Sequence, residues 1–306
     1  MAHDPDEAHL SRKEVRELVD RFRVTSGKGF KLKHFGTANP MPELVDKQRA
    51  PALLRQGVEQ LSELQEALYA NATWSVLLVF QAMDAAGKDS TIKHVMTGIN
   101  PQGIAVTSFK QPGPEDLAHD FLWRINRHLP AQGMIGIFNR SHYEEVLVAR
   151  VHPEILQRQK LPASLSGGKK FWDHRLQDIA SYERHLGRQG TRVLKFFLHV
   201  GRDEQKRRFL DRLTEPNKNW KFSPADLPER EHWDDDLTAY EAALAGTATE
   251  EAPWFVVPAD QKWVTRLVVV AAITEALRDL DLTRPAVSDD VRQSFAEARA
   301  ALEAAD

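Results

Sequence analysis

A lysine and several acidic and hydroxyl side chains follow an apolar run near residue 80. Residues 76–91 read VLLVFQAMDAAGKDST: a strand-like run, a short loop, and then a segment compatible with a helix. In a P-loop, backbone N–H groups converge on phosphate oxygens, the next helix presents its positive end, and a lysine adds a mobile charge. An ordinary Gly-Lys turn is the alternative. The predicted phosphate contacts come from Lys88 and from Ala85, Ala86, Gly87, Asp89 and Ser90.

Two positions depart from the usual G-x-x-x-x-G-K-[ST] pattern. Ala82 stands at the first glycine, so the backbone there must keep a negative φ. Asp89 stands at the hydroxyl residue that would bind the metal, and an aspartate does not act as a serine does beside a triphosphate. Another group must therefore hold magnesium, and Asp84, inside the loop, is the nearest oxygen ligand of suitable hardness.

The elements that must position this loop alternate along the chain. Nearly continuous apolar runs predict strands at 75–81, 104–109, 134–138, 192–199 and 254–257, of the kind that is buried in a parallel sheet. Helices are expected at 88–98, 114–128, 141–150, 169–188, 203–213, 235–245 and 261–280. Apolar residues spaced by three and four predict another over 54–68: Leu54, Val58, Leu61, Leu64 and Leu68. This alternation predicts an α/β fold, a three-layer α/β/α sandwich with a parallel five-stranded sheet and ligands at the carboxyl ends of the strands.

The chain divides into an N-terminal arm (1–50), a kinase-like domain (51–285) and a C-terminal helix (286–306, with the helix itself over 288–305). The segment 203–234 is rich in lysine and arginine and is interrupted by prolines, which is typical of a lid that closes over phosphates and excludes water. A solvated helix face is the competing interpretation.

Composition excludes several classes of protein. The chain has 306 residues, 42% of them hydrophobic, no cysteine and a net charge of -3, so it has neither disulfides nor a zinc-thiolate site and is no general polyanion binder. The start of the chain is polar and acidic, unlike a secretory signal, and the longest apolar run, 267–273, is too short to cross a bilayer. We expect a cytoplasmic protein that binds neither membranes nor nucleic acid.

Four strings together resemble the polyphosphate kinase 2 family. They read QAMDAAGKDSTIKHVMTGINPQG, VTSFKQPGPEDLAHDFLWR, GIFNRSHYEEVLVARVHPE and KRRFLDRLTEPNKNWKFSPADL, and the resemblance runs from about Phe22 to Leu280. The variant strings look most like the group that accepts both nucleoside mono- and diphosphates. The resemblance implies a P-loop kinase core similar to thymidylate kinase, with a helical lid.

The implied reaction moves the terminal phosphate of inorganic polyphosphate to ADP or AMP, or to GDP or GMP, reversibly and by direct in-line transfer. It implies Mg²⁺ as cofactor, with Mn²⁺ as an alternative, and a homodimer or homotetramer. Two other functions stay open: an ATP-dependent nucleoside monophosphate kinase, and a P-loop nucleotide-binding module without turnover.

Carried over by position, the family's Walker A aspartate and lysine match Asp84 and Lys88. Its Walker B pair matches Asn139 and Arg140, where an amide replaces the commoner aspartate. The implied catalytic residues are Asp84, Lys88 and Arg140. Because Asn139 offers only a carbonyl oxygen, the expected metal ligands are Asp84, Asn139 and Glu145, although Asn139 as a simple turn residue is the alternative.

The family's lid cations correspond to Arg207, Arg208, Arg212, Lys218 and Lys221, which suit a chain of phosphates that carries about one negative charge each. Lys110 and Arg124 are expected to reach phosphates or to form structural ion pairs. His119 and His142 are expected to form hydrogen bonds, because direct transfer needs no phosphohistidine. Trp220 either stacks on a base or anchors the lid by burial.

Overall fold

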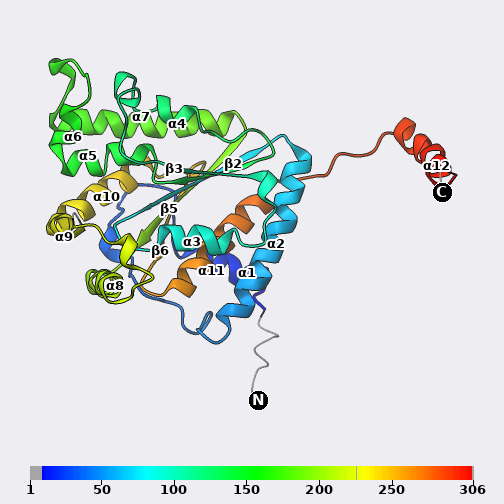
Figure 1. Cartoon of the computed structure of the whole chain (residues 1–306), viewed down its shortest axis with the longest axis horizontal. Helices are drawn as coiled ribbons and strands as arrows, with labels where there is room; N and C mark the ends of the chain where they lie inside the picture. The colour runs from blue at the N-terminus through cyan, green and yellow to red at the C-terminus, as the bar shows by residue number, and fades with distance from the viewer. Residues whose placement is uncertain (1–8, 225, 305–306) are drawn as a thin grey trace.

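The computed structural model describes residues 9–224 and 226–304, and its centre is one six-stranded sheet (Figure 1). The strands are β1 (Arg23–Val24), β2 (Ser75–Ala82), β3 (Ile104–Ser108), β4 (Ile135–Asn139), β5 (Thr191–His199) and β6 (Trp254–Pro258). Their order is β1-β6-β5-β2-β4-β3, and β2 to β6 are parallel. The five predicted parallel strands are confirmed. The sheet also has an edge strand that the sequence did not predict, β1, which pairs antiparallel with β6 over only two residues.

The central strands are buried on both faces, as their composition requires. All eight residues of β2 are buried, and so are all five of β6. Because β2 lies between β4 and β5, the loop that follows it emerges at the middle of the sheet's carboxyl edge. This is the point at which strand order reverses in open α/β sheets, and where ligands bind.

Helices cover both sides of the sheet (Figure 1). On one side, α2 (Ala50–Asn71) packs on α11 (Lys262–Arg278), which also contacts α1 (Arg12–Asp20) and α3 (Lys88–Val95). On the other side, α7 (Gly168–Arg188) packs on α10 (Trp233–Thr247). The apolar stripe predicted over 54–68 faces the core, since its members Leu61 and Leu68 are fully buried. The three layers follow from these contacts.

Two predicted helices are wrong in extent. Residues 114–128 form only η4 (Asp116–Ala118) and α4 (Trp123–Asn126), and residues 141–150 form η5 (His142–Glu145) and part of α5 (Val148–Val151), which α6 (Pro153–Gln157) follows. Side chains bond to the backbone at both breaks: the Asp120 carboxylate accepts from Leu122 N–H, and the Ser141 hydroxyl accepts from Tyr143 N–H. Such local bonds compete with helix formation.

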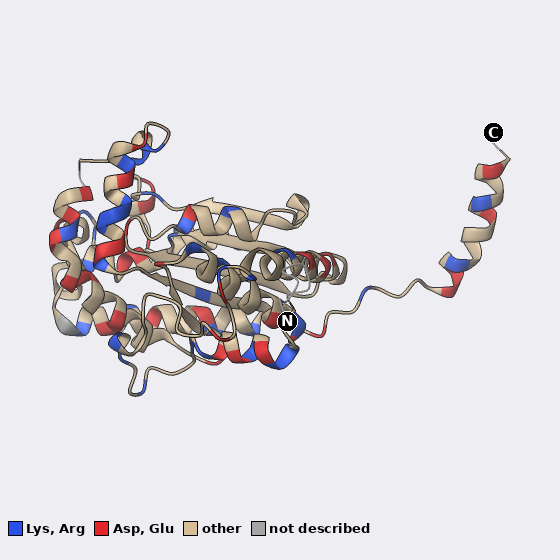
Figure 2. Cartoon of the chain, turned by 90° about the horizontal axis from the view of Figure 1, so that it is seen from below, with Lys and Arg blue, Asp and Glu red and all other residues tan. Residues whose placement is uncertain are grey.

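The lid region is helical. It contains α8 (Arg202–Thr214), η7 (Asn219–Lys221), α9 (Asp226–Glu229) and η8 (Arg230–His232) before α10 begins. The remaining short turns are η2 (Leu32–His34), η3 (Pro101–Gly103) and η6 (Ala163–Leu165). Lysine and arginine are mixed with acidic residues on the surface helices of the molecule (Figure 2), in agreement with the small net charge.

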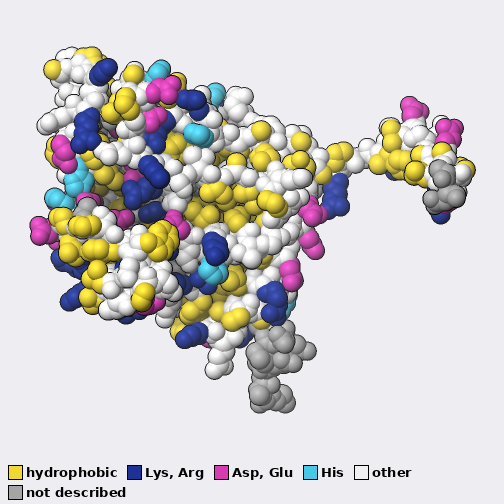
Figure 3. All heavy atoms as spheres, in the orientation of Figure 1, with side chains coloured by type: hydrophobic (Ala, Val, Ile, Leu, Met, Phe, Trp, Pro, Cys, Tyr) yellow, Lys and Arg dark blue, Asp and Glu magenta, His cyan; other side chains and the backbone are white. Residues whose placement is uncertain are grey.

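Helix α12 (Asp289–Glu303) lies apart from the body of the molecule (Figure 1, Figure 3), and all its residues are exposed. It does not pack on the core, which was one of its two expected positions. Ala305, the predicted end of this helix, and residues 1–8 of the predicted arm lie outside the described residues. The division into arm, domain and C-terminal helix stays a prediction. No helix within 9–224 or 226–304 is long and apolar enough to cross a membrane.

Candidate active site

The predicted phosphate loop connects β2 to α3. Ala82 is the last residue of β2, in extended backbone, which confirms that an alanine fits where P-loops usually have glycine. The turn instead uses Ala85, at φ 61°, and Gly87, at φ 103°, where glycine is the favoured residue. Gly87 is the N-cap of α3, so the helix begins at Lys88 and directs its N-terminus at the loop.

Lys88 lies in a cleft formed by this loop. Its Nζ donates to the carbonyl oxygen of Ala82, 2.8 Å away, and no carboxylate lies within ion-pair distance among the described residues. Burial lowers the pKa of Lys88, and the Arg140 guanidinium lowers it further, while Asp84 partly compensates. A bound anion would remove this electrostatic penalty, as expected for a phosphate-binding lysine.

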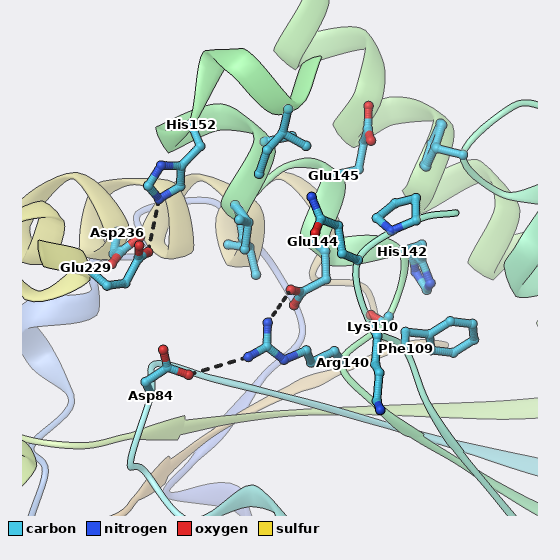
Figure 4. A pocket seen from close by; sticks show the side chains of 18 of the residues that line it. Asp84, Phe109, Lys110, Arg140, His142, Glu144, Glu145, His152, Glu229 and Asp236 are labelled. Carbon is cyan, nitrogen blue, oxygen red and sulfur yellow. Dashed lines mark hydrogen bonds and ion pairs between the residues drawn. The ribbon is translucent and has the colours of Figure 1, made fainter. Parts of the chain in front are cut away.

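Asn139 is the last residue of β4, and Arg140 directly follows it, beside the loop. The Asn139 amide donates to Asp89 Oδ1 at 2.7 Å. Arg140 has a φ of 63°, unusual for a residue with a side chain, and its guanidinium lies 3.1 Å from Glu144 and 3.5 Å from Asp84 (Figure 4). The negative charge of Glu144 raises the pKa of Arg140 most strongly, and the charge of Asp84 raises it further. Arg140 is therefore a fixed cation at the carboxyl edge of the sheet.

The cleft has a volume of about 410 Å³ and gathers most of the predicted site. It is strongly cationic, with few carboxylates to oppose its lysines and arginines. The predicted residues that line it are Asp84, Ala85, Ala86, Gly87, Lys88, Asp89, Ser90, Lys110, Asn139, Arg140, Arg208, Arg212, Lys218 and Lys221. Arg124, Glu145 and Arg207 do not line it.

The predicted lid cations differ in their ion pairs with acidic residues. Arg212 pairs with Asp226 at 3.1 Å and Lys218 with Glu215 at 2.6 Å. Arg207, which does not line the cleft, pairs with Glu204 and Asp211.

Trp220 is 78% exposed, so its predicted role as a buried lid anchor is wrong. The Lys221 ammonium lies 5.1 Å from the centre of its ring. Base stacking by Trp220 stays a prediction.

Lys262, at the first position of α11, lines the same cleft and was not predicted. No described carboxylate lies within ion-pair distance of it. Burial lowers its pKa, and Arg208, Lys218 and Arg266 lower it further. In the sequence, Lys262 is a single lysine 28 residues after the end of the basic segment 203–234, and only the return of β6 to the sheet brings it to the phosphate loop.

A larger cavity, of about 660 Å³, adjoins the cleft. Rings of Phe109, Phe121 and Tyr240 contribute to its walls, together with polar and charged groups. Five residues border both spaces: Met83, Asp84, Phe109, Lys110 and Arg140. The two spaces therefore meet at a junction with one carboxylate and two cations.

Arg124 and Glu145 lie on the wall of the larger cavity. Arg124 pairs with Asp116 at 3.6 Å and donates to the carbonyl oxygen of Lys110, so it forms the structural ion pair that was one of its two expected roles. Glu145 lies 3.2 Å from Arg175 and accepts from Gln159 at 2.7 Å. Glu145 does not line the cleft where Asp84 and Asn139, the other predicted metal ligands, lie, although Asp84 also borders the larger cavity. No group of three or more metal-ligating His, Cys, Asp or Glu side chains occurs in the described part of the chain.

An acidic and histidine cluster borders the cavity near the lid (Figure 4). His152 lies 3.0 Å from Glu229 and its ring contacts that of His232. Burial, and then the charge of Glu229, raise the pKa of Asp236 to about 7, while His152 and His232 oppose the shift. Asp236 therefore titrates near neutral pH.

Neither predicted hydrogen-bonding histidine contacts the phosphate loop. His119 bonds the carbonyl oxygen of Glu115 and stacks on Trp123. His142 is buried, 3.4 Å from Glu183. Both contacts agree with the prediction that these histidines form hydrogen bonds.

Comparison with known proteins gives a consistent result. Residues 44–285 match the family Polyphosphate kinase 2 (PPK2). The "ADP-polyphosphate phosphotransferase" of Rhodopseudomonas palustris is 50% identical over 91% of this chain and 96% of its own length. The "AMP/ADP-polyphosphate phosphotransferase" of Meiothermus ruber is 42% identical over 87% and 96%. The crystal structure of polyphosphate kinase 2 from Arthrobacter aurescens TC1 superposes with a TM-score of 0.83 at 40% identity, covering 92% of this chain and 96% of that one.

Proposed function

Because this chain belongs to the polyphosphate kinase 2 family, we propose that it phosphorylates nucleotides with inorganic polyphosphate as the phosphoryl donor. It is an enzyme of the kinase class, a polyphosphate:nucleotide phosphotransferase. One relative is named for ADP and another for both AMP and ADP, which supports nucleoside mono- and diphosphates as acceptors. A further relative is named a GDP-polyphosphate phosphotransferase, which supports GDP as an acceptor, and we propose GMP as an acceptor to be tested beside it.

The observation that carries this proposal is the junction of two cavities of different character. A cationic cleft and a larger cavity with aromatic walls share Asp84, Lys110 and Arg140. Phosphoryl transfer requires donor and acceptor phosphates to meet in line at one point. The shared border is that point, with the donor in the cleft and the acceptor in the larger cavity.

The donor end suits a linear polyanion. Lys88, Lys218, Lys221 and Lys262 are separate positive charges along one cleft, and the phosphate loop adds backbone N–H groups. A chain of phosphates bears about one charge per internal unit, so spaced cations match it better than one strong site. The acceptor end, at about 660 Å³, is within the size range of small-molecule pockets.

The reaction follows from these positions. An oxygen of the nucleotide's terminal phosphate attacks the terminal phosphorus of the polymer, the new O–P bond forms as the bond to the next phosphate breaks, and the shortened polymer leaves. Lys88 and Arg140 neutralise charge on the transferring group. That nucleotide oxygen is already ionised near neutral pH, so no strong general base is required. Lid residues exclude water, which would otherwise hydrolyse the donor.

Mg²⁺, or Mn²⁺ in its place, is the proposed cofactor. Oxygens of Asp84, Asp89 and Asn139 border the cleft, and such hard donors fit this ion, which usually keeps water and phosphate ligands as well. When bound, the ion supplies further neutralisation of phosphate charge. Glu145 fits this role less well, because Arg175 and Gln159 already engage its carboxylate.

The test is an assay of ATP formation from ADP with polyphosphate as sole donor, repeated with AMP, GDP and GMP, and with EDTA. A parallel assay supplies ATP and AMP without polyphosphate. We expect polyphosphate-dependent product that EDTA abolishes. Turnover of ATP and AMP without polyphosphate, and none with polyphosphate as donor, would indicate a nucleoside monophosphate kinase instead. Tight nucleotide binding without any turnover would indicate a binding module.

A cytoplasmic location and a homodimer or homotetramer complete the proposal. The mass of the purified chain, measured by light scattering after size-exclusion chromatography, tests the assembly.

A further inference from the structure

Helix α8 holds three consecutive carbonyl groups of the phosphate loop. Gln205 Nε2 donates to Asp84 O at 3.0 Å, and Arg208 Nη1 donates to Ala85 O at 3.0 Å and to Ala86 O at 2.8 Å. Gln205 and Arg208 are one helical turn apart, so they share a face of α8. Both are buried, at 3% and 7% exposure.

The other donors of Arg208 are also engaged. Its Nη2 donates to the carbonyl oxygens of Ala259 and Asp260, and its Nε donates to Glu204. A guanidinium has five N–H donors, and these contacts account for all five. In this arrangement Arg208 has no N–H left for a phosphate oxygen, although the sequence predicted it as a phosphate ligand.

The carbonyl contacts determine where the loop's N–H groups point. In a trans peptide the C=O and the following N–H point in opposite directions. Since the carbonyls of Asp84 and Ala86 accept from Gln205 and Arg208, the N–H groups of Ala85 and Gly87 point away from these two side chains; Ala85 and Gly87 both line the cleft. Neither N–H has an acceptor among the described residues, whereas Ala86 N–H bonds Met83 O.

The same contacts explain how this loop tolerates few glycines. Ala85 adopts φ 61°, a left-handed conformation that is unfavourable for a residue with a side chain. Hydrogen bonds from Gln205 and Arg208 offset that cost and exclude other orientations of the two peptides. The loop is therefore organised by a neighbouring helix instead of by its own glycines.

We propose that Gln205 and Arg208 are positioning residues, which keep the phosphate loop in its anion-binding form without touching the substrate. This inference rests on the proposed function only for the identity of the anion. It also implies that the base of α8 stays attached to the loop, so any lid movement occurs beyond Arg208.

Binding of tripolyphosphate tests the inference without turnover. Calorimetry at several salt concentrations gives the dissociation constant and its salt dependence for the parent, Gln205→Leu, Arg208→Lys and Arg208→Gln. Loss of a direct phosphate contact lowers the slope of log Kd against log salt, by about 0.7–0.9 per contact on nucleic acids. Arg212→Gln, in the same cleft, is the matched control for such a loss.

We expect Gln205→Leu and Arg208→Lys, which both conserve charge, to weaken tripolyphosphate binding about tenfold with an unchanged slope. Arg208→Gln should also keep the parent slope, while Arg212→Gln lowers it. Arg208→Lys with normal affinity, or Arg208→Gln with the reduced slope of Arg212→Gln, would overturn the inference. If an Arg208 variant does not fold, Gln205→Leu decides alone: normal affinity refutes the role. Failure of the parent to bind tripolyphosphate would instead count against the proposed donor.

Discussion

The amide of Asn139 donates to Asp89 Oδ1 across 2.7 Å, joining the end of β4 to the first turn of α3. These are two of the three positions at which the chain departs from common P-loop kinase sequences, the third being Ala82. An amide can donate where a carboxylate cannot, so the two departures compensate each other. A carboxylate at both positions would place two negative charges in contact unless a cation or proton lay between them.

Asn139→Asp should therefore make folding depend on magnesium. We expect a lower Tm than the parent in EDTA, by several degrees, and a larger rise in Tm when Mg²⁺ is added. The double variant Asp89→Asn/Asn139→Asp restores one amide and one carboxylate, and it should return the EDTA value towards that of the parent. Equal Tm shifts with Mg²⁺ in all three proteins would contradict this account.

Asp84→Asn should lower turnover far more than binding. Asp84 lies at the junction of the two cavities, 3.5 Å from Arg140. We expect kcat to fall about 10²–10³-fold, the usual range for a lost electrostatic contact at a reacting group, with KM changed less than about threefold. Asp203→Asn, on the exposed start of α8, is the control and should keep parent kinetics. Turnover near the parent level in Asp84→Asn would show that Asp84 has no role in the reaction.

Lys262→Met should weaken the donor specifically. Its ammonium has no described carboxylate partner and lies in the cationic cleft, so a phosphate of the polymer is its natural counterion. Steady-state kinetics should show KM for polyphosphate raised about tenfold, KM for ADP unchanged, and a weaker salt dependence. Lys13→Met, which removes one exposed lysine of α1, controls for net charge. The prediction fails if both variants change KM equally.

Asp236→Asn should stabilise the protein at high pH. Asp236 has a pKa of about 7 in the folded chain, above that of an unfolded aspartate, so the folded state binds more protons between about pH 4 and pH 7. The free energy of unfolding contributed by this group therefore falls as pH rises through that window and is constant above it. Glu229 and Asp84 face Asp236 and disfavour its charge, while His152 and His232 oppose them. Melting curves should show that the Tm of Asp236→Asn rises relative to the Tm of the parent from pH 5 to pH 8. A difference in Tm that stays constant over this range would refute the assigned titration.

Lys195→Met should destabilise the core. Lys195 and Glu183 form a fully buried ion pair, and Lys195 also donates to Tyr143 and to the carbonyl oxygen of Thr247. Removing one partner leaves an uncompensated buried charge, which costs about 3–5 kcal/mol. Urea unfolding should report that loss, and Lys195→Met/Glu183→Gln should recover part of it. A loss below about 1 kcal/mol would mean that Glu183 becomes protonated without penalty.

The sequence predicted the five parallel strands well because they read as apolar runs, and the central ones are buried on both faces, although β3 at the edge is mostly exposed. Contacts between side chains and groups that are distant in the sequence were harder to predict. Nothing local shows that Arg208 turns to carbonyl groups while Arg212 remains at the cleft, since both are arginines on one helix. Lys262 was missed because its neighbours in space are far away in sequence. Glu145 follows Glu144 directly, yet only Glu144 faces Arg140, a distinction set by the broken helix after β4.

The common border of the two cavities also defines how the site can be blocked. A nucleoside joined covalently to an oligophosphate can span the cleft and the larger cavity across Asp84 and Arg140. Such a tethered molecule loses translational freedom once, where two separate molecules lose it twice. Bisubstrate inhibitors of this enzyme should accordingly compete with both of its ligands at once.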